Sequence, residues 1–428
     1  MIPRTLWLVS GIALTTIGTR LEAQSLERRI AQVRDGEVEF HYAARSGVCG
    51  DGKYWMRVDA NSWYGNINDA TRMAPCETGP VRVLLTRADG LTIKLQTYAG
   101  PLQSEPGATN VGRVPAREAA TFLLSIAESI DARTGRDAVF PATLADSATI
   151  TPALLTIVQD RDRPRGVRQS AMRYLAQRAG EPGGVSGREA GRVIATLARD
   201  DRDNQQLRQQ ALSELMRIDA GAGYTAIEEL ASGTNDPWLA GAATKALASS
   251  GDPRARTFLR RAAGRSDLPS EAQIAAIQGL GGEYGSAADA TFLRDLYPRL
   301  TSDRAREATL NAVASIGGSA NARWLLNLAR GDTGGVRLRR HAISLADRAG
   351  AAVTDLIALY DDVGDSEVRA AVIDALARDG SRAAVDKLLA IAREDTQVNQ
   401  RRRAISALGK FDDARVREAL RGLVERPR

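Results

Sequence analysis

The chain has 428 residues, of which 43% are hydrophobic and only 5% aromatic, and its 58 Lys and Arg against 52 Asp and Glu leave a formal net charge of +6. Its length is that of about two to four ordinary domains or of one repeat array. The charge excess is small for this length and both signs are interspersed. This argues against a nucleic-acid partner, because such proteins need a clustered basic face and stacking aromatic side chains. The densest basic run, residues 401–403, is predicted to be a solvated helix face.

The N-terminus has the pattern of a secretory signal. Arg4 supplies a positive charge, residues 6–18 form an apolar stretch too short for a membrane span, and Ala23 ends a cleavage site at residues 21–23. We therefore expect residues 1–23 to be removed and the mature chain to be exported to the periplasm or the extracellular space. An uncleaved anchor helix is the alternative. No later stretch approaches the roughly 20 apolar residues of a span, so no membrane span is expected after cleavage.

Residues 25–100 have the pattern of a small α+β domain. Ser25 is expected to cap a short helix, and alternation of apolar and polar residues predicts the first strand. The predicted strands are residues 37–43, 54–58, 81–86 and 91–95. The last two form a hairpin, because a short turn that contains Gly90 joins them. We predict a mostly antiparallel sheet, followed by a linker over residues 101–112. The domain resembles no family that we recognise.

The chain contains two cysteines, Cys49 and Cys76, both in this predicted domain. In an oxidising compartment, two cysteines in one small domain usually pair. Closing a loop of this length contributes about 3–4 kcal/mol to stability in the chain-entropy model. We therefore predict a disulfide between Cys49 and Cys76. The alternative, a thiol or metal site, lacks a CxxC motif and has only His41 nearby, so no metal site is expected.

Trp63 and Tyr64 lie in a polar loop, residues 59–71, that is rich in Asn and Asp. Exposed aromatic rings in such a loop can bind a sugar, which makes the pair a candidate glycan site. The alternative is that both rings pack onto their own sheet, as large amphipathic rings commonly do. Both interpretations are open at this point.

From residue 168 onward, one pattern recurs about every 32 residues: an Arg, a small apolar residue three positions later, and a Leu or similar residue four positions after that. The repeat Arg positions are Arg168, Arg208, Arg306, Arg339, Arg369 and Arg401. Ala240 and Gln273 replace the Arg in two further copies. Offsets of three, four and seven lie on one helix face, and an apolar helix precedes each copy. Two helices in each of about eight or nine repeats predict a mainly α fold, an α-solenoid over residues 113–428, because one hairpin alone cannot bury its apolar face.

The repeat resembles the HEAT-repeat family, in the short form of phycobilisome-lyase-type proteins, over residues from about 115 to 428. The resemblance implies that the repeat Arg ties adjacent repeats together, often with an Asp six positions before it. The matching pairs are Asp162 with Arg168 and Asp395 with Arg401. Ala240 and Gln273 break this ladder, so we expect looser packing around them.

No catalytic motif is evident, and the two histidines, His41 and His341, lie in different predicted domains. We therefore expect no enzyme, no catalytic residue and no cofactor. HEAT-type solenoids present a concave face lined by the second helix of each repeat, which predicts an exported scaffold that binds a protein partner there. The candidate contact residues are Arg173, Gln177, Arg217, Lys245, Arg340, Asp374 and Arg403.

Two alternative functions stay open. In the first, the N-terminal domain binds envelope polysaccharide through Trp63 and Tyr64, and the solenoid is a spacer. In the second, the resemblance to lyase-type proteins implies an enzyme, or a helper, that attaches a chromophore to a protein. The expected export argues against the second alternative.

Overall fold

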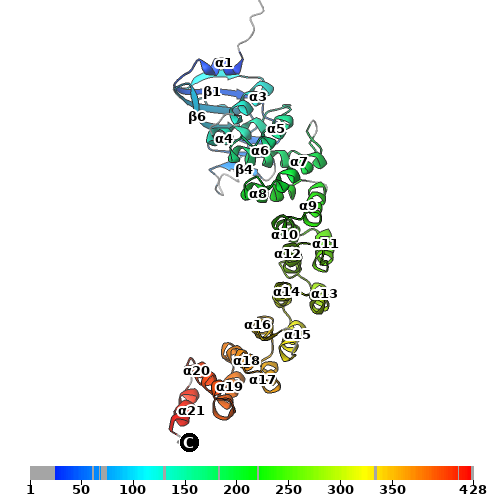
Figure 1. The fold of residues 1–428 in the computed structure, drawn as a ribbon. Coiled ribbons are helices and arrows are strands. Elements are labelled where there is room, and N and C mark those ends of the chain that lie inside the picture. Colours follow the sequence, from blue (N-terminus) through cyan, green and yellow to red (C-terminus); the bar gives the residue numbers. More distant parts are fainter. Residues whose placement is uncertain are drawn as a thin grey trace, which may run out of the picture. The chain divides into compact units, whose positions relative to one another are not determined.

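The computed structural model describes residues 25–59, 62–66, 68, 75–128, 132–181, 184–218, 221–331, 335–412 and 414–425. The predicted signal peptide, residues 1–23, lies outside these ranges. The chain divides into two compact units, Met1–Ala171 and Met172–Arg428 (Figure 1). The boundary falls within helix α6 (Arg165–Gln177).

The first unit contains two small sheets and several helices. Its elements are α1 (Leu26–Ala31), β1 (Gly36–Tyr42), β2 (Val48–Gly50), β3 (Trp55–Val58), β4 (Ser62–Gly65), β5 (Val81–Ala88), β6 (Leu91–Ala99), β7 (Thr109–Arg113), α3 (Ala116–Ala127), α4 (Ala132–Thr143) and α5 (Thr151–Gln159). The larger sheet has the order β6-β5-β1-β7, and the smaller has the order β2-β3-β4. β7 is parallel to β1, and the other pairs are antiparallel. The predicted strands are confirmed as β1, β3, β5 and β6, whereas β2, β4 and β7 were not predicted.

The segment predicted to be a linker, residues 101–112, is in part a strand of the larger sheet. β7 begins within it and pairs with β1, and just beyond β7 the main-chain N of Val114 donates to the carbonyl O of His41 at 2.8 Å. β7 contains Asn110 and Gly112, which are disfavoured in strands, so its strand signal is weak. Parallel pairing with a strand far away in the chain leaves no local sequence pattern.

A buried ion pair holds the same segment against the sheet. Arg82 Nη1 lies 3.1 Å from Glu39 Oε2, and both side chains are almost fully buried. Glu39 also accepts hydrogen bonds from the main-chain N of Glu105 at 3.1 Å and from Nδ2 of Asn110 at 2.8 Å. Because a buried carboxylate needs such partners, Glu39 fixes the chain between β6 and β7.

Helices α3 and α4 share a core with the larger sheet. Tyr42 Oη donates to the carbonyl O of Pro141 in α4 at 2.6 Å, and the Phe40 ring meets the Phe122 ring of α3 edge-on at 6.0 Å. The predicted boundary after residue 112 therefore does not separate two cores, because the first compact unit continues to Ala171.

The predicted disulfide is confirmed. Cys49 of β2 is bonded to Cys76, and their Cα atoms are 5.3 Å apart. The bond closes the loop that contains β3 and β4, which form a small three-stranded sheet with β2. The cross-link therefore stabilises this sheet by restricting the unfolded chain.

The second unit is a stack of helical hairpins. After the end of α6, its helices are α7 (Gly187–Arg199), α8 (Gln205–Leu215), α9 (Ala222–Gly233), α10 (Pro237–Ala248), α11 (Pro253–Ala263), α12 (Ser270–Leu280), α13 (Ala287–Leu296), the 3-10 helix η1 (Tyr297–Arg299), α14 (Asp303–Ile316), α15 (Ser319–Arg330), α16 (Gly335–Arg348), α17 (Val353–Asp362), α18 (Ser366–Asp379), α19 (Arg382–Glu394), α20 (Val398–Leu408) and α21 (Ala414–Glu425). The even-numbered helices pack on one another from α8 to α20, and we call them the even layer. Figure 1 shows the even layer on the concave side of this unit. The predicted α-solenoid is confirmed.

Asp-Pro pairs begin two of these helices. Asp236 and Asp252 each precede a Pro, and their carboxylates accept the main-chain N–H groups of Leu239 at 3.2 Å and of Arg254 at 2.8 Å. Such a cap satisfies a donor that has no partner inside the helix, and Pro in the first turn loses no hydrogen bond.

Packing around α12 is close. A Cβ added to Gly279 would lie 2.4 Å from Ala248 Cβ of α10, and one added to Gly281, just after α12, would lie 2.4 Å from Ala312 Cα of α14. Only glycine permits such an approach. The glycines therefore let the neighbouring helices approach closely at the C-terminal end of α12.

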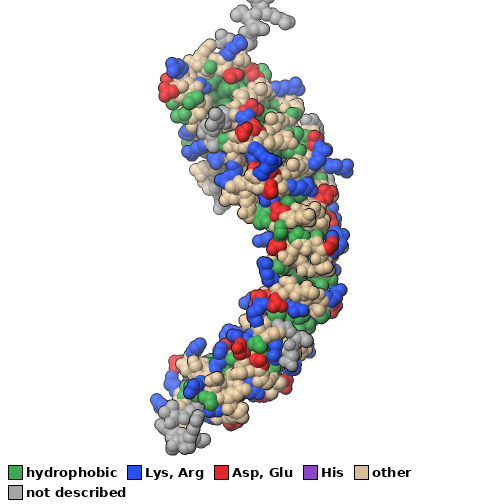
Figure 2. All heavy atoms as spheres, viewed as in Figure 1, with side chains coloured by type: hydrophobic (Ala, Val, Ile, Leu, Met, Phe, Trp, Pro, Cys, Tyr) green, Lys and Arg blue, Asp and Glu red, His purple; other side chains and the backbone are tan. Residues whose placement is uncertain are grey.

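Charged side chains of both signs are scattered over the face that Figure 2 draws. Figure 2 shows Lys and Arg interspersed with Asp and Glu rather than gathered in one patch, as the composition indicated. In the part of the chain that the structure describes, no helix combines the length and the apolar character needed to cross a bilayer.

Candidate partner-binding surface

Three of the predicted repeat arginines link the second helix of a hairpin to the end of its first helix. The Nε atoms of Arg168, Arg208 and Arg339 donate to main-chain carbonyls ten residues earlier, at 3.1, 2.9 and 2.9 Å. These carbonyls are at the end of the preceding helix, where they lack a helical N–H partner and carry the negative end of the helix dipole. Gln273 makes the same contact through Nε2 to the carbonyl O of Ala263 at 3.1 Å. The role of these residues is structural.

The other repeat arginines contact the turn before their helix or the first turn of that helix. Arg369 Nε donates to the carbonyl O of Val363 at 2.7 Å, and Arg401 Nη1 donates to that of Asp395 at 2.7 Å. Arg306 Nη1 lies 3.6 Å from the Asp303 carboxylate in the first turn of α14. The interaction of Asp395 with Arg401 therefore uses its main chain and not its carboxylate.

Some repeat arginines also reach the next repeat. Arg208 Nη2 lies 2.5 Å from Asp236 Oδ2, and Arg369 Nη1 lies 3.7 Å from Asp395 Oδ2. The Asp395 carboxylate also accepts a hydrogen bond from Tyr360 Oη at 2.6 Å, and this burial and pairing raise the pKa of Tyr360 well above its ordinary value. These links support the implied tie between adjacent repeats.

The predicted contact residues lie on the solvent side of the even layer and of the α6 end within the second unit. Arg173, Gln177, Arg217, Lys245, Arg340 and Arg403 are exposed, and Asp374 is half-buried. Several of them pair with each other or with neighbours. Arg403 Nη2 lies 2.5 Å from Asp374 Oδ2, and Arg340 Nη1 lies 2.9 Å from Glu367 Oε2.

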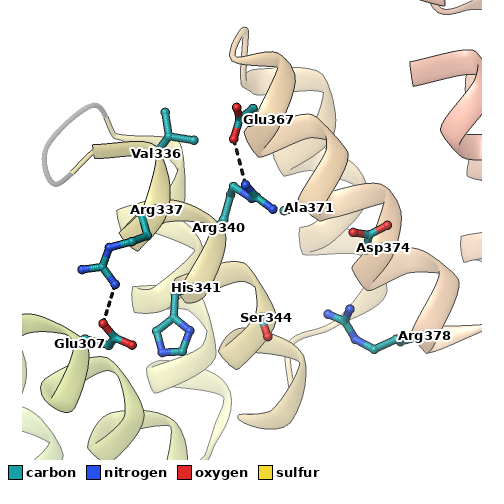
Figure 3. A pocket seen from close by; sticks show the side chains of 10 residues that line it. All are labelled: Glu307, Val336, Arg337, Arg340, His341, Ser344, Glu367, Ala371, Asp374 and Arg378. Carbon is teal, nitrogen blue, oxygen red and sulfur yellow. Dashed lines mark hydrogen bonds and ion pairs between the residues drawn. The ribbon is translucent and has the colours of Figure 1, made fainter. Parts of the chain in front are cut away.

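Two hollows on the even layer bring these residues together. The first, which we call the α16 groove, has a volume of about 580 Å³ and lies between α14, α16 and α18 (Figure 3). Its lining includes Glu307, Arg337, Arg340, His341, Glu367 and Asp374. Arg337 Nη1 contacts Glu307 Oε2 at 2.5 Å, so the cations of this groove already have carboxylate partners.

His341 lies inside the α16 groove beside Glu307, as Figure 3 shows. Its Nε2 is buried without a hydrogen-bond partner. Burial lowers the pKa of His341, Glu307 raises it by a smaller amount, and Arg337 and Arg348 lower it further. The imidazole is therefore mostly neutral at neutral pH.

The second hollow, which we call the α10 groove, has a volume of about 840 Å³ and lies between α8, α10 and the start of α12. Its lining includes Arg217, Trp238, Gly241, Ala242, Lys245 and Glu271. Arg217 and Lys245 were predicted as contact residues, whereas Trp238 was not. The sequence carried one signal that could have identified Trp238 as a contact residue. Trp238 lies in α10, a helix whose only charged residue is Lys245.

The candidate glycan residues pack within the first unit. The Trp63 ring lies 5.4 Å from that of Trp55 and 5.6 Å from the Arg57 guanidinium, and the Tyr64 ring lies 4.4 Å from that of Phe140 in α4. Both residues are half-buried. This is the arrangement of the alternative interpretation, in which the rings pack onto their own domain.

The described residues contain no group of three or more His, Cys, Asp or Glu side chains placed to hold a metal ion. His41 lies in β1, and burial together with Arg113 lowers its pKa, whereas Glu39 raises it. Among the described residues, no carboxylate forms a hydrogen bond with the side chain of either histidine, as one that orients a catalytic base would.

Residues 353–428 match the family model for HEAT repeats, which confirms the predicted resemblance in that part of the chain. Human deoxyhypusine hydroxylase in complex with glycerol is 20% identical over 60% of this chain and 94% of that chain, with a TM-score of 0.25. The complex of CpcE and CpcF of phycocyanin lyase from Nostoc sp. PCC7120 is 18% identical over 64% of this chain and 94% of that chain, with a TM-score of 0.25. Kap121p is 11% identical over 68% of this chain and 38% of that chain, with a TM-score of 0.38. No curated protein matches.

Proposed function

We propose that this chain is an exported, non-catalytic scaffold that binds a protein partner on the solvent face of the even layer. A HEAT-repeat solenoid suggests a scaffold or protein-binding role, because stacked repeats present a long, continuous surface. The observation that carries the proposal is the pair of grooves on this layer. Two predicted contact residues line each one, Arg217 and Lys245 in the α10 groove and Arg340 and Asp374 in the α16 groove.

Export is part of the proposal. The disulfide between Cys49 and Cys76 supports it, because such bonds persist in oxidising compartments and are rare in the cytosol. The pattern of residues 1–23 supports it from the sequence.

The polysaccharide alternative finds little support in the first unit. Trp63 and Tyr64 use their ring faces against Trp55 and Phe140, so less aromatic surface is left for a sugar. The enzyme alternative rests on resemblance alone.

Site-specific photo-crosslinking in cells tests the proposal. A benzoylphenylalanine would replace Lys245 or Arg340 on the even layer, and Glu229 of α9 or Arg323 of α15 as exposed controls on the other layer. We expect one protein to be crosslinked from the even-layer positions and not from the controls. The full chain is needed, because a truncation at residue 113 would remove β7 and the sheet on which α4 packs.

Two results would overturn the proposal. Equal crosslinking from both layers would show that the even layer is not the binding face. Crosslinking from a benzoylphenylalanine placed at Trp63 and from none of the four other positions, or recovery of glycan without protein, would move the function to the first unit.

A further inference from the structure

The α10 groove interrupts a ladder of ion pairs on the even layer. On this layer Arg337 pairs with Glu307, Arg340 with Glu367 and Arg403 with Asp374, each across two successive repeats. α10 carries one charged residue, Lys245, and no acid. Lys245 is exposed and has no carboxylate within 4.0 Å in the described part of the chain.

The charge of the groove lining is positive on balance. Arg217 and Lys245 are its cations, and Glu271 is its carboxylate. Glu271 Oε1 lies 4.0 Å from Arg304 Nη1 of α14, so its charge is shared with a cation outside the groove. Arg217 Nε lies 3.6 Å from Glu214 Oε2, but Glu214 is buried and Arg217 is about half exposed, so the guanidinium is what a ligand would meet.

The shape of the groove suits an extended chain. Gly241, Ala242 and Ala246 line the hollow along α10, so the side chains there are short and a backbone can approach the helix. Trp238 lines the same hollow one turn earlier and is half-buried, with the Arg208 guanidinium 4.4 Å from its ring. A half-exposed indole in a concave site is a common anchor for an apolar side chain.

We propose that the α10 groove binds an extended acidic peptide segment of the partner. An Asp or Glu of the segment pairs with Lys245, a second acid approaches Arg217, and an apolar side chain packs on Trp238. Charge complementarity assigns the occupant, because Lys245 is an unpaired cation in a groove that is lined by two cations and one carboxylate. This inference rests on the proposed function and names the chemistry of its ligand.

A selection from a display library of random linear peptides tests the inference on the full chain with its disulfide formed. We expect the selected peptides to be enriched in Asp and Glu, and their binding to weaken as salt rises. Lys245→Glu should weaken binding about tenfold, since it turns an attraction into a repulsion. Ser213→Trp, an exposed position in the groove, should weaken binding without changing the charge.

Arg323→Glu on α15 is the matched control, because it makes the same change of charge at an exposed position outside the groove. It should leave peptide binding within twofold of the original. Peptides without acidic bias, or peptides that bind the Lys245→Glu and original chains equally, would overturn the inference. They would leave the proposed function intact if even-layer crosslinking still recovers one protein. A library that yields no binders would overturn a linear acidic peptide as the ligand class.

Discussion

In the first unit, the contacts that close the core join residues far apart in the chain, as Tyr42 joins Pro141 and Glu39 joins Asn110. In the second unit, the long contacts join one repeat to the next, as Arg337 joins Glu307 and Arg403 joins Asp374. A unit built from neighbour contacts can open in one place and stay folded elsewhere, whereas a unit built from distant contacts opens as a whole. Three perturbations test this difference.

The largest expected effect is loss of the disulfide. Cys76→Ser should destabilise the first unit by about 3–4 kcal/mol in the chain-entropy model and leave the second unit unchanged. Hydrogen–deuterium exchange, resolved to segments, should show faster exchange throughout β1, β5 and α4. Because Cys49 remains, a Cys49→Ser, Cys76→Ser double variant controls for a free thiol. Faster exchange confined to β2–β4 would show that the first unit is not cooperative.

The second effect concerns Asp289 of α13. It is 1% exposed, forms an ion pair with Arg256, and lies 2.8 Å from Arg260 Nη2. Asp289→Ala leaves these guanidiniums without their carboxylate and should cost about 3 kcal/mol, at the low end for a buried pair because both arginines are partly exposed. Exchange should increase in α11–α14 and remain slow in α17–α20. Asp295→Ala, exposed on the same helix, should have little effect; global opening would contradict the neighbour-contact description.

The pKa of Asp289 predicts that the contribution of this residue to stability depends on pH. Burial raises the pKa of Asp289, but hydrogen bonds from Ser286, Arg256 and Arg260 outweigh burial and hold the pKa below its ordinary value. A group with a lowered folded pKa stabilises the protein above its unfolded pKa, about 3.9 for Asp, and loses this contribution as the pH falls through the folded pKa. The stability difference between the original chain and Asp289→Ala should therefore shrink below about pH 4.

The smallest effect is expected for Gly281→Ala. The added Cβ would lie 2.4 Å from the backbone of Ala312, so α12 and α14 must move apart, at a cost of about 1–3 kcal/mol. Gly364→Ala is the control, since nothing lies within 4 Å of its added Cβ. Urea unfolding of both variants measures the difference. Equal stability of the two would mean that the close contact at Gly281 relaxes without cost.

The sequence predicted the repeat unit well because its signals are local. The offsets around Arg208 and Arg339 lie within one helix, and each side chain contacts the helix just before it. The first unit was predicted less fully, because β7 depends on a distant partner and the packing of Tyr64 on Phe140 cannot be read from spacing.

The candidate surface was also predicted only in part: the sequence indicated which residues are exposed, but not which cations lack a partner. Exposure on the even layer follows from helix periodicity, which identified Arg217 and Lys245 as contact residues. The structure shows that both line the same groove. Which cations lack a partner depends on neighbouring repeats, so the difference between Lys245 and Arg340 required the structure. Trp238 was missed for the same reason, because its neighbours decide how far it is buried.

The contact from Arg208 or Arg339 to a carbonyl ten residues earlier has a consequence for how such a chain can change in evolution. This hydrogen bond lies inside one hairpin. A duplicated hairpin would therefore keep the bond between its two helices wherever it is inserted. A duplication after α14 would lengthen the array and leave the α10 groove as it is. A duplication between α10 and α11 would instead separate Lys245 from Glu271, so the same genetic event could either extend this protein or change what it binds.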